Sequence, residues 1–520
     1  MSILITFLIL VLTALTLLIL RITIPGFRYN WVLAVGGTLI AWISAFLWQL
    51  QMPVRLQLTI WQPATLFSQS PAFLADRTSW AFTISLIALC LAIILTAVVR
   101  PRFPSPINWV GTLVMTSLGM LALVADNPLT LLLIWAAIDL VELVVQIWFV
   151  EDPKLSERVV ISFASRATGI LILLWADMAA AASGQISDFR AATPQTGLYL
   201  LIAAALRVGV LPLHLPYPSE SALRRGFGTG LRMVSAASSL VLLARIPASS
   251  IVSPINPYLL MLVAVAAVYG GWMWLRAPDE LTARPYWLIG MGSLVVAAAL
   301  RSNPTGAAAW SCALILSGGA LFLSSEPSKW LARALFAGAF AISALPFSLT
   351  ATGWVSGGTG FWPAFPILLL SQAMLVAGYV RHAQRTLTRL PHGEQPIWAR
   401  NVYPIGIALL LLTAVLLGLF GWDGALKIGN VLAGLIVPAA AFGLLWLTPR
   451  LRILNPVRAH WVRPTNTSWL DWIYQGFWNL YRQLGRVSNA FTNLLEGESG
   501  IMWTLLFLVL FITVFTQRTP

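Results

Sequence analysis

Apolar stretches about 20 residues long follow one another along almost the whole chain, separated by short irregular segments. A helix needs about 20 apolar residues to cross the hydrocarbon of a bilayer. Only 10% of the 520 residues are charged, against roughly a quarter in soluble domains, so lipid must cover most of the apolar surface. These features predict an all-α polytopic membrane protein with about 16 transmembrane helices.

The positions of the spans follow from the apolar stretches and from the Pro and Gly residues near their ends. The first span is too long for a signal-peptide core and has no basic segment before it, so we expect it to be retained. Cys90 and Cys312 lie inside apolar runs and are expected to be buried, with no disulfide or metal role. The predicted spans are residues 2–20, 31–48, 80–99, 108–125, 128–150, 159–182, 196–213, 226–246, 257–275, 285–300, 306–324, 331–350, 362–380, 402–420, 428–447 and 500–516.

Basic residues are unevenly divided between alternate loops. The loops after odd-numbered spans hold about 22 of the 32 Lys and Arg, whereas the loops after even-numbered spans, with the C-terminal tail, hold about 7. The positive-inside rule then predicts a multi-pass protein of the cell (inner or plasma) membrane with an extracytoplasmic N-terminus. The net charge of +14 therefore reflects topology, and no nucleic-acid partner is expected.

The chain is expected to have three regions: a helix bundle over 1–449, an interfacial segment over 450–499 and a last transmembrane helix over 500–520. The middle region carries aromatic and aliphatic residues at helical spacing, with Arg482 and Arg486 nearby. This pattern predicts an amphipathic helix on the cytoplasmic side. It either lies in the membrane interface or docks onto a partner, and the sequence favours neither.

Ionisable side chains near the middle of spans occur in four consecutive spans, the fifth to the eighth. Such groups cost several kcal/mol at bilayer depth unless they are paired, so each is a candidate functional residue. Two acids three positions apart share one face of the fifth helix. The candidates are Asp139 and Glu142 in the fifth span, Arg166 and Asp177 in the sixth, Arg207 in the seventh with His214 at its end, and Arg232 in the eighth.

These charges have two possible roles: static buried ion pairs that fix helix packing, or a proton or ion path. Arginine does not release its proton in proteins, and the three lysines (Lys154, Lys329 and Lys427) lie in loops or at span ends. A relay would have to run on carboxylates, water and His214. The four histidines lack metal-ligand or haem spacing and no phosphate-binding loop is present, so no cofactor and no metal is expected.

Three segments carry a family resemblance. In chain order they are LFSQSPAFLADRTSW (66–80, with Asp76 at an acidic position), ADNPLTLLLIWAAIDLVELVVQIW (125–148) and RVGVLPLHLPYPSESALRRG (207–226). They resemble segments of the antiporter-like subunits of complex I, of Mrp-type cation/proton antiporters and of membrane-bound hydrogenases. APDELTARPYW and ISALPFSL are weaker echoes, and the C-terminal region looks most like the large, L-type (subunit 5) member.

The resemblance covers about residues 75–350. It implies inverted five-helix repeats with discontinuous helices, for which Pro212, Pro216 and Pro346 are the candidate break points. It also implies other membrane subunits as partners, in a multisubunit complex of the NADH–quinone oxidoreductase type that couples electron transport to proton translocation.

The departures from the family pattern concern its proton relay. In the family, a Glu of the fifth span pairs with a Lys of the seventh, and lysines and a histidine of later spans continue the path. Here Glu142 or Asp139 matches the acid, Arg207 stands at the Lys position, and the eleventh and twelfth spans have no matching lysine. We therefore expect a degenerate relay, a locked Glu142–Arg207 salt bridge between the fifth and seventh helices, and a mainly structural role.

Two other classes stay open. One is an independent transporter, coupled to protons or cations or carrying an anion on Arg207 and Arg232. The other is the membrane subunit of an inorganic-carbon uptake complex, as in a related family branch. No nucleophile or cofactor constellation supports an enzyme in its own right.

Overall fold

The computed structural model describes residues 2–58, 70–100, 104–149, 153–184, 188–217, 225–325, 328–355, 363–385, 396–420 and 422–450, with the isolated residues 475, 476, 479 and 483. The chain divides into two units, Met1–Arg463 and Pro464–Pro520. All elements below belong to the first unit. The predicted interfacial segment (450–499) and last span (500–516) fall almost wholly outside the described residues.

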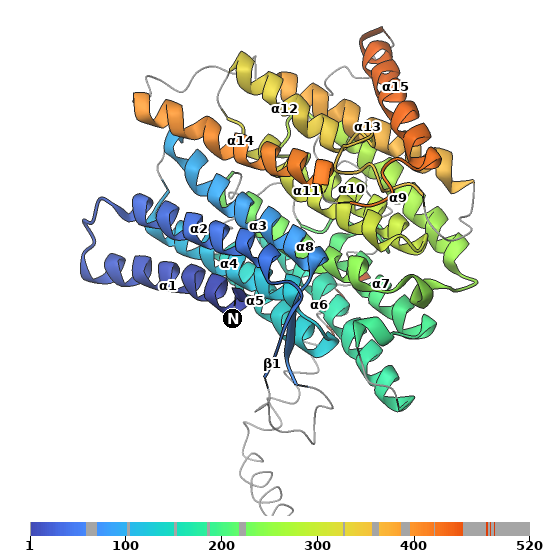
Figure 1. Cartoon of the computed structure of the whole chain (residues 1–520), viewed down its shortest axis with the longest axis horizontal. Coiled ribbons are helices and arrows are strands. Elements are labelled where there is room, and N and C mark those ends of the chain that lie inside the picture. Colours follow the sequence, from blue (N-terminus) through green and yellow to red (C-terminus); the bar gives the residue numbers. More distant parts are fainter. Residues whose placement is uncertain are drawn as a thin grey trace, which may run out of the picture. The chain divides into compact units, whose positions relative to one another are not determined.

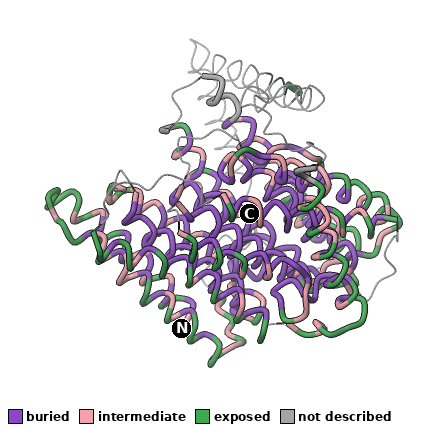
Figure 2. The backbone as a smooth tube through the Cα atoms, turned by 90° about the horizontal axis from the view of Figure 1, so that it is seen from above, coloured by how far each residue is buried: buried purple, intermediate pink, exposed green. Residues whose placement is uncertain are grey.

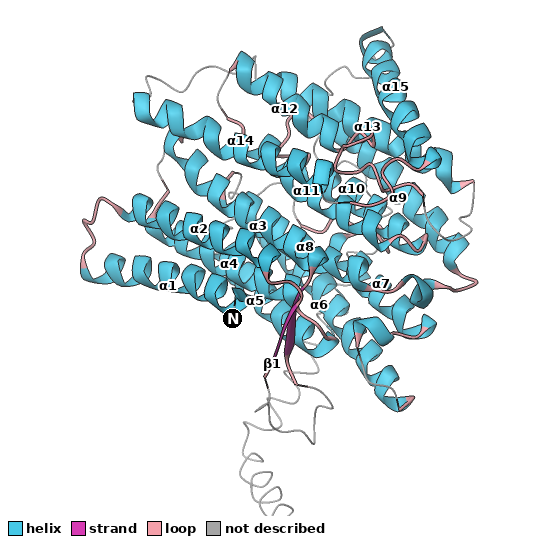
Figure 3. Cartoon of the chain, in the orientation of Figure 1, coloured by secondary structure: helices cyan, strands magenta, loops and turns pink. Residues whose placement is uncertain are grey.

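Helices make up nearly all of the described structure (Figures 1 and 3). The α-helices are α1 (Ser2–Thr23), α2 (Asn30–Leu47), α3 (Arg77–Thr96), α4 (Pro106–Val124), α5 (Pro128–Phe149), α6 (Pro153–Ala182), α7 (Pro194–Val208), α8 (Phe227–Arg245), α9 (Asn256–Arg276), α10 (Arg284–Leu300), α11 (Pro304–Leu323), α12 (Lys329–Ala341), α13 (Ala364–Arg385), α14 (Ile397–Phe420) and α15 (Ile428–Arg450). The strands are β1 (Val54–Gln57) and β2 (Ala72–Ala75), and short 3-10 helices cover Trp48–Leu50, Ala97–Val99, Phe189–Ala191 and Ala248–Ile251.

Each of the first fifteen predicted spans coincides with one of these helices. Within the described part of the chain, 12 helices are long and apolar enough to cross a membrane, and α10 is a shorter apolar helix. The prediction of an all-α polytopic membrane fold is therefore confirmed. Cys90 and Cys312 are buried, as expected.

Burial separates the helices into an inner and an outer set (Figure 2). The apolar windows of α8 and α11 are 100% buried and that of α3 is 94% buried, whereas those of α1, α2 and α15 are about one third buried or less. A helix that is apolar all round is stable only when it is surrounded by other apolar groups. The outer helices expose large side chains such as Ile5, Leu12 and Phe442, which suits contact with lipid or with another membrane subunit.

Two groups of five helices share one packing pattern. In the first group α4 contacts both α5 and α8, and in the second α9 contacts both α10 and α13. The fourth helix of each group is short: α7 has 15 residues and α12 has 13. This correspondence between α4–α8 and α9–α13 is what repeated five-helix units with a discontinuous fourth helix require.

The end of α7 is set by a glycine. Gly209 takes the left-handed conformation (φ 81°) and its N–H bonds back to the carbonyls of Ala205 and Leu206. A Cβ at this position would lie 2.3 Å from the carbonyl oxygen of His214, so only glycine fits without strain. The chain then turns before Pro212 and Pro216, and α7 stops five residues before the predicted end of its span.

The end of α12 has a different construction. The helix stops at Ala341, nine residues before the predicted end of its span, and an irregular segment containing Pro346 follows. The carbonyl of Ala341 accepts from both the N–H and the hydroxyl of Thr350, and that hydroxyl also accepts from the N–H of Ala344. The predicted break points therefore lie where helices stop, and side chains satisfy the freed backbone groups there.

The strands form a hairpin that is attached to the start of α5. β1 and β2 pair antiparallel, with Val54 opposite Ala75. The carboxylate of Asp126 lies 2.9 Å from Nε of Arg55, and the amide of Asn127 donates to the carbonyl of Ser70 at 2.8 Å. Asn127 also caps α5, because its Oδ1 accepts from the N–H of Thr130 at 2.9 Å. The Asp-Asn pair thus anchors the hairpin.

Asp76 begins α3. Its carboxylate accepts from the N–H of Ser79, and its own N–H donates to the Ser79 hydroxyl, both at 2.8 Å. This reciprocal pair is a capping box. Asp76, the acidic residue of the segment before the third span, therefore acts as the N-cap of α3.

Candidate functional site

The polar face of α5 is the base of the candidate site. Asp139, Glu142 and Gln146 are spaced by three and four residues, so they lie on one face of the helix, and all three are buried. This face looks toward α6, which packs on α5, and toward α7, which packs on α6. Each of these neighbours supplies one arginine.

Arg207 of α7 holds Asp139 with both terminal nitrogens. Nη1 and Nη2 donate to the two carboxylate oxygens at 2.6 and 2.8 Å. Nε donates to the hydroxyl of Ser239 at 3.0 Å, and Nη1 also donates to the carbonyl of Arg166 at 3.1 Å. The guanidinium carbon lies 4.3 Å from the centroid of the Trp135 ring. All three nitrogens of Arg207 therefore have partners, and the group is fixed in position.

Arg166 of α6 holds Glu142. Its Nη1 lies 2.5 Å from Oε2 of Glu142, and its Nε lies 3.7 Å from Oδ1 of Asp139. The second oxygen of Glu142 accepts from Nε2 of Gln146 at 2.6 Å. Four charges thus alternate in sign across α5, α6 and α7, away from water.

The predicted Glu142–Arg207 salt bridge is wrong, because Arg207 pairs with Asp139. A salt bridge does join α5 and α7 as predicted, but its acid lies one turn earlier on α5. Arg207 stands one residue before the end of α7 at Val208, and its guanidinium lies at the turn of α5 that carries Asp139. Glu142 is taken by Arg166 from the helix between them.

A glycine lets α7 approach α6 closely at this point. A Cβ on Gly169 would lie 2.6 Å from Cγ of Arg207 and 3.1 Å from the carbonyl oxygen of Ala203. Distances under 3.0 Å require one of the two groups to shift. The small residue on α6 therefore positions the arginine of α7.

Arg232 of α8 has no carboxylate partner among the described residues. Its guanidinium carbon lies 3.9 Å from the centroid of the Tyr217 ring. It is buried, and its Nε and Nη1 have no hydrogen-bond partner in the described structure. Arg232, Arg166, Arg207 and Glu142 line one small cavity, together with Tyr217.

Two of the predicted residues lie apart from this cluster. His214 is buried in the segment after α7, where Nδ1 lies 2.8 Å from the carbonyl oxygen of Pro212. Asp177 is half-buried near the end of α6 and forms no ion pair with any described residue. The structure therefore brings together Asp139, Glu142, Arg166, Arg207 and Arg232 and leaves His214 and Asp177 outside the ion pairs.

Sequence reasoning missed several members of the site. Gln146 follows Glu142 by one helical turn, and the same-face rule could have found it. Arg284, assigned to a loop, is buried at the start of α10 and donates to the hydroxyl of Thr229 at 2.9 Å. Tyr217 had no signal of its own, because only the folded chain places its ring against Arg232.

Comparison with solved structures identifies the fold. The chain is similar to a chain of the Mrp complex from Dietzia sp. DQ12-45-1b, with a TM-score of 0.69 and 16% identity over 100% of this chain and 63% of that one. It is also similar to a chain of the membrane-bound sulfane sulfur reductase, an archaeal respiratory membrane complex (TM-score 0.63, 13% identity, 98% and 100% covered). A chain of respiratory complex I from Thermus thermophilus matches with a TM-score of 0.60 and 19% identity over 86% and 100%.

The chain has the fold of the antiporter-like membrane subunits. It spans about 63% of the length of the Mrp chain that it matches. No family model matches the sequence, and no curated protein matches it. At these identities the similarity concerns the fold, so the chemistry must be argued from the side chains.

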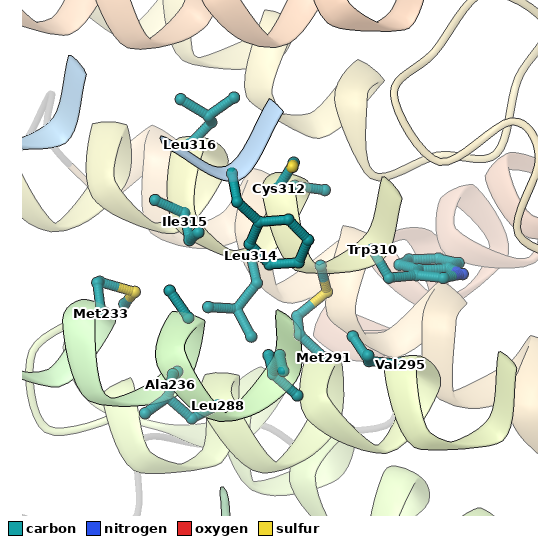
Figure 4. Close-up of a cluster of buried hydrophobic side chains, with 14 of the residues drawn as sticks. Met233, Ala236, Leu288, Met291, Val295, Trp310, Cys312, Leu314, Ile315 and Leu316 are labelled. Atoms are coloured by element: carbon teal, nitrogen blue, oxygen red, sulfur yellow. The ribbon is translucent and has the colours of Figure 1, made fainter. Parts of the chain in front are cut away.

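Between α8, α10 and α11 this antiporter-like fold holds a cluster of buried apolar side chains. Ionisable side chains are buried elsewhere beyond α8: Glu280, Arg284, Arg301 and His382. Figure 4 shows side chains of α8, α10 and α11 packed against one another with no acid or base among the labelled ones. The apolar windows of α8 and α11 are fully buried. The labelled residues are Met233, Ala236, Leu288, Met291, Val295, Trp310, Cys312, Leu314, Ile315 and Leu316.

The second break of the antiporter-like fold has no ion pair among the described residues. One buried guanidinium lies beside it, that of Arg301, 5.5 Å from the centroid of the Trp354 ring. Near the end of α12, Gln372 of α13 donates to the carbonyl of Ile342 at 2.8 Å and accepts from the indole N–H of Trp354 at 2.9 Å. The hydroxyl of Tyr379 donates to the carbonyl of Ser317 at 3.0 Å. These groups satisfy backbone carbonyls and carry no charge at neutral pH.

Proposed function

We propose that the chain is an antiporter-like subunit of the membrane arm of a complex I-like, energy-converting complex, with a mainly structural role. The fold supports the class of subunit. The observation that carries the structural role is the state of Arg207, whose three nitrogens all have partners within α5, α6 and α8. A guanidinium keeps its proton under all physiological conditions.

The packing beyond α8 supports the same proposal. A proton path through the chain would need titrating groups or water between α8 and α11, and one cluster of side chains there, drawn in Figure 4, is apolar. The charged half of the fold would then hold helices together, and any flux would pass through partner subunits. In this proposal the N-terminus lies outside the cytoplasm, and residues 450–499 form an interfacial segment on the cytoplasmic side.

Co-purification tests the proposed assembly. The full chain, tagged and extracted in mild detergent, should bring down other membrane subunits together with iron–sulfur or NADH-binding subunits. A stable and active monomer that transports an ion by itself would contradict the proposal.

The variant Arg207→Lys tests the proposed role in the same complex. Lysine can exchange a proton but cannot reproduce the two-pronged contact with Asp139. We expect the recovered complex to fall and proton flux per assembled complex to stay unchanged. A rise in flux per complex would mean that a path exists and that only its residue 207 had been disabled.

A transporter remains the second candidate because of Arg232, which is buried without a carboxylate partner among the described residues. Arg207 no longer supports an anion-transport role, since Asp139 occupies it. Transport would require a route from the cavity beside Arg232 to both faces of the membrane, and liposome assays with the purified chain would detect it.

A further inference from the structure

The charges of the cluster do not balance. Two carboxylates, Asp139 and Glu142, face three guanidinium groups, and the ion pairs use Arg207 and Arg166. Arg232 is left without an ion pair among the described residues, and Glu280 pairs with Arg225. A buried positive charge without a counter-charge is costly in a membrane interior.

The donors left without partners belong to residues that line one cavity. Nε and Nη1 of Arg232 and Nε and Nη2 of Arg166 are buried, and none has a hydrogen-bond partner among the described residues. Both arginines are about 2% exposed, and both line the cavity between α5, α6, α7, α8 and α10. The free groups of these arginines are all donors, so they favour a ligand that accepts hydrogen bonds. Glu142 and Tyr217 also line the cavity, and the carboxylate of Glu142 is held by Nη1 of Arg166.

The size of the cavity limits the ligand to a single small species. Its water-accessible volume is about 10 Å³, which is close to the room needed by one water molecule. A polyatomic anion such as a carboxylate or phosphate ester is too large for this space, so a monatomic ion is the anion that requires the least rearrangement of the lining. The excess of positive charge, to which the buried Arg284 beside Thr229 of α8 also contributes, favours an anion.

We propose that a chloride-sized anion binds in this cavity, held by Arg232 and Arg166, and completes the charge balance of the α5–α8 cluster. The ring of Tyr217 covers one face of the Arg232 guanidinium at 3.9 Å, so the ligand would meet the edge of the guanidinium, where the N–H groups lie. The other oxygen of Glu142 accepts from Gln146, and both oxygens of Asp139 accept from Arg207. The anion would be a resident structural ion, and the site adds a ligand to the proposed subunit without making it a transporter.

Halide-dependent stability tests the site. The full chain, purified with any co-purifying subunits, is placed in gluconate buffer, and chloride or bromide replaces gluconate at constant ionic strength. We expect a saturable rise of a few degrees in the tryptophan-fluorescence Tm, as ligand binding to the folded state requires. Chloride-35 NMR line broadening should saturate over the same concentration range.

Variants separate the site from general salt effects. Arg232→Gln should abolish both responses, and Arg232→Lys should weaken them, because it keeps the charge but loses the fork. Arg276→Gln is the matched control: Arg276 also lies over an aromatic ring, that of Trp272 at 5.3 Å, but at the end of α9. It should keep the full halide response.

Three results would overturn the proposal. The first is an equal Tm in chloride and gluconate for the unchanged chain, with no line broadening. The second is an Arg232→Gln variant that still responds; if this variant does not fold, Arg232→Lys with an unweakened response counts in the same way. The third concerns Glu220, which is three residues from Tyr217 in sequence and lies outside the described residues: a halide response that appears only in Glu220→Gln would identify its carboxylate as the counter-charge.

Discussion

Removing the carboxylate of Asp139 while keeping its shape is the sharpest perturbation of the buried cluster. In Asp139→Asn, the side chain can accept one of the two hydrogen bonds from Arg207, now 2.6 and 2.8 Å long. Its amide group would set donor against donor on the other side. The guanidinium keeps its charge, because arginine does not deprotonate, and it stays buried without a counter-ion.

Breaking a buried ion pair from one side costs about 3–5 kcal/mol. We expect Asp139→Asn to lose an amount in this range from the free energy of unfolding. Arg207→Gln should lose less, because Asp139 keeps a second cation, Nε of Arg166 at 3.7 Å. The double variant, Asp139→Asn with Arg207→Gln, has the same net charge as the unchanged chain. Its loss of unfolding free energy should be about 2–3 kcal/mol smaller than the sum of the two single losses.

The assay is equilibrium unfolding of the full chain in mixed micelles, followed by tryptophan fluorescence. Asp177→Asn is the matched control, since this acid of α6 has no ion pair with a described residue, and its effect should stay within about 0.5 kcal/mol. If the two single losses simply add in the double variant, Asp139 and Arg207 act independently and the reasoning from a locked pair fails.

Two further predictions concern packing and topology. Gly169→Ala places a methyl group 2.6 Å from Cγ of Arg207 and should lower the free energy of unfolding by about 1–3 kcal/mol in the same assay. Gly443→Ala is the control and should be neutral, because its Cβ would have nothing within 4 Å. Equal effects of the two variants would contradict the close approach of α6 and α7. A tag before Ser2 should be reached by membrane-impermeant label from the extracytoplasmic side in intact cells, and labelling only after lysis would reverse the proposed orientation.

The helices could be predicted because their determinant is local. Apolar length alone located the first fifteen spans, because each segment carries by itself the apolar length needed to cross lipid. The breaks near the prolines at 212, 216 and 346 were implied by the family resemblance, since apolar length predicted longer spans than α7 and α12 have.

The pairing within the cluster could not be predicted in the same way. Glu142 and Asp139 are one turn apart, and which of them meets Arg207 depends on how α7 is placed along α5. That placement follows from contacts of α6, including Gly169 and Arg166, which no periodicity of α5 or α7 encodes. Arg284 was missed for a related reason, because its position at the start of α10 is buried only through the packing of α8.

The fixed guanidinium of Arg207 has a consequence for whatever subunit packs against this chain. A site that gains and loses protons presents its neighbours with a field that fluctuates with pH and with turnover. In the proposed complex, the same local dipole, Arg207 against Asp139, would persist in every state of the assembly. An adjoining subunit would meet a constant electrostatic boundary at this chain, against which its own charges could move.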